Sequence, residues 1–302
     1  MKRKALVLFL VSLLAVSLSA ARASAAPHKI FLVTMDQMDQ HWVNLNAGCE
    51  KAAKEIGNVE YSWTAPDVKD DAKQIECINN AVAAGANAIL LAANGPDAVT
   101  AALKEATSEG VKIIYVDSPA NFPGVATFVT NNQTGGEMAG KEMLKALEVA
   151  GIAEGKIGIV NVNAATASVV AREKGFREAL AGSKFQILET QYGDGDVARS
   201  KDIAANFITQ GCVGIFGTNE GSTTGVGNAI QEAGDKVFGV GFDQSDAVRQ
   251  LIKNGHLLCT MKQNPDVMGY EALKAAVEVL DGKSVSPEPV DTGVTVLTKD
   301  NL

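Results

Sequence analysis

The sequence predicts an α/β protein made of two doubly wound, parallel-sheet (Rossmann-like) domains. Three observations predict this class. Apolar, strand-like segments alternate with helical segments along the chain from residue 28 onward. The apolar segments are nearly continuous, which indicates strands that are buried on both faces of a parallel sheet with helices on each side. The strand series also runs twice, first to residue 131 and again from residue 156.

The individual elements follow from this alternation. Strands are expected in the first series at 28–35, 59–65, 88–94, 112–118 and 125–131, and in the second at 156–163, 185–192, 213–219, 237–243 and 257–263. Helices are expected between them, for example at 41–56, 69–84, 97–109, 134–150, 168–181, 199–210, 222–233 and 266–281. Glycines that supply a left-handed helix cap follow many helical segments: Gly57, Gly85, Gly110, Gly151, Gly182, Gly211, Gly234, Gly255 and Gly282.

The first 25 residues have the three parts of a secretory signal. Lys2, Arg3 and Lys4 form a positive head, an apolar run covers 5–21, and Ala23-Ser24-Ala25 is a small-x-small exit. The apolar run is short for a membrane span, and no stop-transfer pattern follows it. We therefore expect cleavage after Ala25 and a periplasmic product, without a lipid anchor because no cysteine lies near the cleavage site.

Charge and motifs exclude several classes of function. The formal charge is −8, and removal of a leader with four positive charges leaves −12. Such an acidic chain lacks the electrostatic footprint for nucleic acid or anionic lipid. It contains no nucleophile elbow, phosphate-binding P-loop or His-Glu-x-x-His motif, so we expect a binding protein and not an enzyme, with no cofactor and no metal. The segment 193–196 (GDGD) is too short for a calcium loop and predicts a turn.

Polar side chains close nearly every predicted strand. The carboxyl ends of strands in doubly wound sheets face the binding crevice, and amides and carboxylates suit a ligand rich in hydroxyl groups. His41 and Trp42 offer flat faces for a sugar ring, and Arg172 offers a planar fork of donors. The candidate ligand-binding residues are Asp39, His41, Trp42, Asn94, Asp117, Asn163, Arg172, Tyr192, Asn219, Asp243 and Gln263.

Each candidate also has a structural alternative. Asp39, Asn219 and Asp243 are equally suited to cap the helices that follow them, and Asn94 suits a cap or a turn. Trp42 fits an ordinary core position, while Arg172 and Gln263 fit solvated ones. His41, Asn163 and Tyr192 taken singly favour neither interpretation. Asp117 is the stronger case because it closes a buried strand, where a charge needs a partner. The joint position of these residues at one rim favours the functional interpretation.

Short segments in a fixed order carry a family resemblance. They are Asn131-Asn132-x-x-Gly135-Gly136, 171–176 (AREKGF), 217–220 (GTNE), 240–243 (VGFD), and 261–266 (MKQNPD) with Gly269. Together they show that the chain resembles the periplasmic sugar-binding proteins of ABC transporters, in particular the ribose/galactose-binding group. The resemblance covers essentially the whole chain after the leader.

The resemblance implies two lobes joined by a three-strand hinge, with the ligand in the cleft. The lobes would be 26–130 plus 264–291 and 131–263 plus 292–302. It also implies a monosaccharide ligand, delivery to a permease in the inner membrane, and a monomer. The alternative is a sensory protein that presents a sugar-like or polyol signal to a chemoreceptor or kinase. Ribose itself is not implied, because His41-Trp42, Ser118 and Ala92 replace two aromatic residues, an Arg and an Asn of the ribose-binding type.

Cys49, Cys77, Cys212 and Cys259 form no Cys-x-x-Cys motif, which leaves a zinc site unsupported. In the strand order 2-1-3-4-5 that the resemblance implies, the helices that carry Cys49 and Cys77 lie on opposite faces of the first sheet. The strand that ends at Asp243 separates the other two cysteines. We therefore expect four unpaired thiols, most of them buried.

Overall fold

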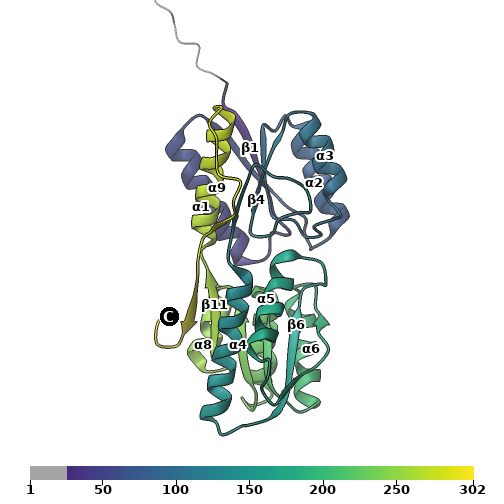
Figure 1. Ribbon diagram of the computed structural model, residues 1–302, viewed down its shortest axis with the longest axis vertical. Helices are drawn as coiled ribbons and strands as arrows, with labels where there is room; N and C mark the ends of the chain where they lie inside the picture. Colours follow the sequence, from purple (N-terminus) through teal and green to yellow (C-terminus); the bar gives the residue numbers. More distant parts are fainter. Residues whose placement is uncertain (1–25) are drawn as a thin grey trace, which may run out of the picture.

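The chain forms two sheets that lie one above the other along the long axis of the molecule (Figure 1). The computed structural model describes residues 26–302, so the predicted signal segment and its cleavage site lie outside the described residues. Both sheets carry helices on both faces, which confirms the predicted doubly wound class.

The first sheet has the order β12-β5-β4-β3-β1-β2, and all its strand pairs are parallel. This confirms the predicted 2-1-3-4-5 core. Its strands are β1 (His28–Val33), β2 (Val59–Thr64), β3 (Ala88–Leu91), β4 (Lys112–Val116), β5 (Ala126–Val129) and β12 (Val290–Asp291). One face packs on α1 (Gln40–Ile56) and α9 (Pro265–Leu280), and the other on α2 (Asp71–Ala83) and α3 (Thr100–Ser108).

The second sheet has the order β13-β11-β10-β9-β6-β7, and the short β8 also pairs with β6. Its strands are β6 (Gly155–Asn161), β7 (Phe185–Ile187), β8 (Gln191–Tyr192), β9 (Cys212–Gly217), β10 (Phe238–Phe242), β11 (Cys259–Gln263) and β13 (Val294–Thr298). One face packs on α4 (Asn132–Val149) and α5 (Ala167–Ala179). The other packs on α6 (Val197–Thr209), α7 (Glu220–Glu232) and α8 (Asp246–Asn254).

Three features of the second sheet differ from the expected elements. The strand expected at 185–192 is split into β7 and β8, which pair with opposite ends of β6. The edge strand β13 runs antiparallel to β11 and was not among the expected strands. The nine-residue helix α8 was not in the expected set, although Gly255, which caps it, was.

The structure confirms the prediction that glycines adopt the left-handed conformation after the helices. All nine glycines named from the sequence have φ values between 71° and 93°, in the left-handed region that a side chain disfavours.

The chain passes between the two sheets at three places, after β5, after β11 and after β12. Hydrogen bonds tie these passages together. The amide of Asn131 donates to Oδ1 of Asp291, the amide of Thr292 donates to the carbonyl of Val129, and Nδ2 of Asn264 donates to the carbonyl of Thr292. The three passages therefore lie side by side at one end of the cleft between the sheets.

Two glycines of the motif segments bring α4 and α5 close together. A Cβ on Gly136 would lie 2.0 Å from the carbonyl oxygen of Arg172, and a Cβ on Gly175 would lie 2.0 Å from that of Gln133. No side chain fits at either place. This close packing fixes the backbone from which the Arg172 side chain extends.

All four cysteines are free, and Cys49, Cys212 and Cys259 are buried. Cys49 and Cys77 lie in the cores on opposite faces of the first sheet, and β10 separates the strands that carry the other two, as the topological argument requires. Among the helices within residues 26–302, none combines the length and the apolar character needed to cross a bilayer.

Candidate functional site

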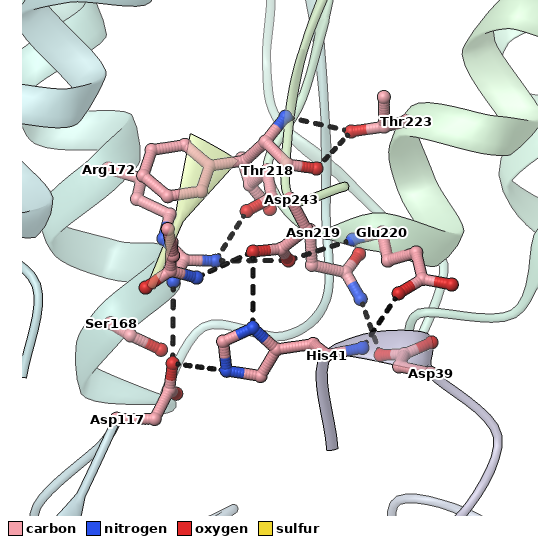
Figure 2. A network of polar contacts seen from close by, with 12 residues as sticks. Asp39, His41, Asp117, Ser168, Arg172, Thr218, Asn219, Glu220, Thr223 and Asp243 are labelled. Atoms are coloured by element: carbon pink, nitrogen blue, oxygen red, sulfur yellow. Dashed lines mark hydrogen bonds and ion pairs between the residues drawn. The ribbon is translucent and has the colours of Figure 1, made fainter. Parts of the chain in front are cut away.

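A small cavity of about 20 Å³ lies where the carboxyl ends of the strands of both sheets face each other. Seven of the predicted ligand-binding residues line it: Asp39, His41, Trp42, Asp117, Arg172, Asn219 and Asp243. They come from both sheets or from the helices that follow their strands, and Figure 2 shows the polar groups of all of them except Trp42 converging. The rule that strand ends face the crevice thus locates the cavity.

His41 lies between two carboxylates that come from different sheets. Its Nε2 is 3.1 Å from Oδ1 of Asp117, which follows β4, and its Nδ1 is 3.7 Å from Oδ1 of Asp243, which follows β10 (Figure 2). Burial alone would lower the pKa of His41, but the two carboxylates outweigh burial, so the pKa is raised. The imidazole therefore tends to carry a positive charge here.

Arg172 is held from three sides. Its Nε donates to Oδ1 of Asn132 at 2.8 Å, its Nη1 donates to the carbonyl of Thr218 at 2.9 Å, and the guanidinium lies 3.9 Å from the ring centroid of Phe242. Its Nη2 is buried and has no hydrogen-bond partner among residues 26–302. The guanidinium lies 3.7 Å from both Asp117 and Asp243, so it is positioned to donate to a ligand between the two carboxylates.

Asp117 and Asp243 share an unusual backbone conformation. Each directly follows a central strand, and each has a positive φ, 57° for Asp117 and 74° for Asp243. Asp tolerates this left-handed region better than most residues, yet it remains costly for a side chain. Such strained positions concentrate at functional sites. Burial would raise the pKa of Asp117, but His41 and Arg172 lower it, so its carboxylate stays ionised as an acceptor.

Asp243 accepts hydrogen bonds from two neighbours, Gln263 at the end of β11 and Glu220 at the start of α7. Its Oδ1 accepts from Nε2 of Gln263, and its Oδ2 accepts from the backbone amide of Glu220 at 3.0 Å. Gln263 is 3 % exposed and its Oε1 has no hydrogen-bond partner within the described chain. Gln263 is therefore a buried residue with a free acceptor, and the solvated alternative does not apply to it.

The capping alternatives apply in part. Asn219 is the N-cap of α7 and its Oδ1 accepts from the amide of Ser222, while its Nδ2 lies 3.4 Å from Oδ2 of Asp39. Asn219 therefore both caps a helix and reaches the cavity. Asp39 occupies the N-cap position of α1 but makes no side-chain cap hydrogen bond. Ser245, and not Asp243, caps α8. Trp42 belongs to the core and also borders the cavity.

Three predicted residues lie outside this group. Asn94 is buried beside it, and its Nδ2 donates to Asp71 while its carbonyl accepts from Thr166. The Asn163 side chain accepts from the amides of Ala165 and Thr166 and so shapes a turn. Tyr192 is 39 % exposed and lines a separate surface groove with Glu173 and Arg177.

Two charged residues of the site were missed by the prediction. Lys69 lines the cavity and pairs with Asp36 and Asp39. The carboxylate of Glu220 accepts from the backbone amide of His41 at 3.1 Å. Burial and the nearby charge of Asp39 raise the pKa of Glu220 to about 7. Lys69 lies in the loop after β2, five residues beyond the last strand residue, and Glu220 stands next to the predicted Asn219.

The chain matches the model of the periplasmic binding protein domain family over residues 30–284. It is 28% identical over 300 residues to the ribose import binding protein of Salmonella typhimurium, covering 95% of this chain and 97% of that protein. A carbohydrate transporter solute-binding protein from Agrobacterium radiobacter, solved in complex with D-arabinose, is 30% identical with a TM-score of 0.87. That match covers 92% of this chain and 96% of the other. An ABC transporter solute-binding protein from Agrobacterium vitis with bound D-fucose is 29% identical, with a TM-score of 0.85 and coverage of 90% and 96%.

Proposed function

The chain belongs to the periplasmic binding protein domain family, and on this premise we propose that it captures a monosaccharide between its lobes and delivers it to the permease of an ABC transporter. Proteins of similar sequence and fold bind ribose, D-arabinose and D-fucose, which supports a sugar as the ligand. The family is made up of substrate-binding proteins, which supports a role in binding for the polar groups of the site.

One observation carries the proposal. Two carboxylates, Asp117 from the first sheet and Asp243 from the second, converge on one buried guanidinium and one imidazole. Vicinal hydroxyl groups of a sugar donate to carboxylates and accept from a guanidinium, so a sugar placed here satisfies groups from both lobes at once. The free Nη2 of Arg172 and the free Oε1 of Gln263 supply a further donor and acceptor.

The cavity volume supports a closing mechanism. A space of about 20 Å³ holds roughly one water molecule, far less than a sugar ring. The lobes must therefore separate to admit the ligand and close on it afterwards. We propose that 26–130 plus 264–291 moves as one lobe and 131–263 plus 292–302 as the other. The hydrogen-bonded passages at Asn131, Asn264 and Thr292 would form the hinge.

The remaining expectations belong to the same proposal. We propose that the 25-residue leader is removed after Ala25, and that the mature protein acts in the periplasm as a monomer. The eleven candidate residues fall into two groups, according to whether they are proposed to contact the sugar directly. Those that line the cavity, together with Gln263, contact the sugar directly, whereas Asn94, Asn163 and Tyr192 do not line it.

A thermal-shift screen of the mature protein against pentoses, hexoses, polyols and nucleosides tests the proposal. A compound that binds the native state and not the unfolded one stabilises it by RT ln(1 + [L]/Kd), so the melting temperature rises with the logarithm of ligand concentration above Kd. We expect one monosaccharide class to give a shift that calorimetry confirms with one site per chain. A screen in which nucleosides or polyols give the shift and all monosaccharides fail would overturn the proposed ligand class.

A further inference from the structure

Lys69 is a buried lysine at the rim of the cleft. It lies in the loop between β2 and α2, and its side chain is 8% exposed. Its Nζ pairs with Asp36 and lies 3.0 Å from Oδ2 of Asp39. A buried charge needs such partners because its desolvation is costly. Asp39 faces the other lobe, where its Oδ2 lies 3.4 Å from Nδ2 of Asn219.

Without Lys69, the carboxylates around Asp39 would disfavour the negative charge on the Asp39 side chain. Burial raises the pKa of Asp39, and the charges of Asp36 and Asp243 act in the same direction, while Lys69 lowers it. Glu220 of α7 also interacts with Asp39. Burial alone would lower the pKa of Lys69, but Asp39 and Asp36 raise it, so the ammonium stays charged. Lys69 is therefore the cation that pairs with two of these four acids, Asp36 and Asp39.

A turn of the second lobe covers the same ammonium. The segment 193–196 (GDGD), which the sequence predicts as a turn, places Gly195 at a φ of 72° directly over Lys69. A Cβ on Gly195 would lie 3.0 Å from Nζ of Lys69 and 3.1 Å from Nδ2 of Asn219. The pair of Lys69 and Asp39 is thus formed within the first lobe and enclosed by the second.

We propose that Lys69 is a specificity-determining positioning residue, which holds the Asp39 carboxylate in place as an acceptor for a sugar hydroxyl. This inference rests on the proposed function of the cleft. Lys69 has three N–H donors and two carboxylate partners, and it acts on the ligand through Asp39. A ligand that lacks a hydroxyl group at this position leaves a buried carboxylate unpaired and binds poorly.

The first test measures affinity. Lys69→Met keeps the length of the side chain and removes its charge, and calorimetry is carried out with D-ribose, D-arabinose and D-fucose. We expect Kd for the sugar that the wild type binds to rise about 10- to 100-fold, as for loss of a charge-assisted contact. Asp39→Asn should give a similar loss, and the double variant should lose no more than Asp39→Asn alone. Fully additive losses would overturn the proposal.

The second test needs no ligand. Asp39 is followed by carboxyl-carbon NMR in the free protein, with Asp39→Asn to assign its signal. Removal of Lys69 should raise the pKa of Asp39 further, because an opposite charge in contact with the carboxylate is lost. An unchanged titration would overturn the role of Lys69. Failure of the wild type to bind any of the three sugars would count against the proposed ligand class and leave this titration intact.

Two further variants control for folding. Lys69→Met leaves two buried carboxylates without their cation, so Asp36→Asn with Lys69→Met removes one of them and keeps the net charge. This double variant should fold, bind weakly and show a smaller rise in the pKa of Asp39, because Asp36 no longer raises it. A wild-type affinity would contradict the proposal. Lys73→Met is the matched control, since Lys73 lies on the adjoining helix α2 and forms an exposed pair with Asp67 of the preceding loop. It should leave both measurements unchanged.

Discussion

The backbone amide of His41 donates a hydrogen bond to Oε2 of Glu220 across 3.1 Å, although the two residues belong to helices on different sheets. Other contacts cross the cleft beside it. The amide of Ser168 donates to Oγ of Ser118, and Oγ1 of Thr166 donates to the carbonyl of Asn94. The closed arrangement is therefore stabilised by direct contacts between the lobes as well as by any ligand.

Closure should be favoured at mildly acidic pH. The pKa of Glu220 is about 7 in the closed state, raised first by burial and then by Asp39. Separation of the lobes exposes Glu220 and returns its pKa toward the ordinary value of 4.5 for a glutamate. The closed state therefore binds more protons between these two values, and its stability falls as pH rises through them. The raised pKa values of His41 and Asp39 act in the same direction. The effect of Glu220 is on the order of 2 kcal/mol.

Small-angle scattering of the ligand-free protein measures this directly. The radius of gyration should be smaller near about pH 5.5 than near about pH 8. Glu220→Gln mimics the protonated side chain, so this variant should stay compact at the higher pH and show a flatter profile. A wild-type radius that does not change with pH, or a Gln variant that is more open, would refute the role of Glu220.

Asp243→Asn should weaken sugar binding about 10- to 100-fold, because a charged acceptor is replaced by a neutral one. Asn is the preferred substitution because it also tolerates the positive φ of 74°, whereas Ala would add backbone strain. Calorimetry measures the loss, and a thermal melt without ligand checks the fold. Asp235→Asn is a matched control, because Asp235 has a φ of 58°, is exposed, pairs with His256 and precedes β10, at the end of the strand opposite to Asp243. Wild-type affinity of Asp243→Asn would remove Asp243 from the site.

Denatured protein should show four reactive thiols without reductant. In the native state Cys77 should react first because it is partly exposed. Burial raises the pKa of Cys49 and of Cys259 to about 12 and that of Cys212 to about 11, so these thiols are poor nucleophiles at neutral pH. Labelling with a thiol reagent followed by mass spectrometry gives the order. Fewer than four thiols in the denatured, unreduced sample would reveal a disulfide.

The sequence predicts the fold class and most of the site because both depend on short-range patterns, whereas the strand order follows from the family resemblance. Continuous apolar strands indicate parallel sheets, and the residue that follows each strand indicates the cleft. Asp117 and Asp243 were found in this way. Asn219 fits both the capping and the binding interpretation, since its Oδ1 caps α7 and its Nδ2 faces Asp39.

The residues that were missed depend on long-range packing. Lys69 lies five residues beyond the end of β2, in a loop whose path no periodicity describes. Glu220 is buried because the His41 amide, 179 residues earlier in the chain, lies against it. Tyr192 was expected at the rim because it ends a strand, but β8 is a two-residue strand and its side chain lies beside α5 residues on the outer surface. None of these positions follows from local pattern.

Gly195→Ala should impair closure of the cleft. The new Cβ would lie about 3.0 Å from Nζ of Lys69 and 3.1 Å from Nδ2 of Asn219, and both atoms are already held by other partners. Gly182→Ala is a matched control, because its φ of 80° imposes the same kind of backbone strain, roughly 1 kcal/mol, while nothing lies within 4 Å of the new Cβ. Both variants should lose similar thermal stability. The dissociation rate of the bound sugar, measured by stopped-flow tryptophan fluorescence, should rise on the order of tenfold for Gly195→Ala alone. Equal dissociation rates for the two variants would show that the turn at 193–196 does not take part in closure.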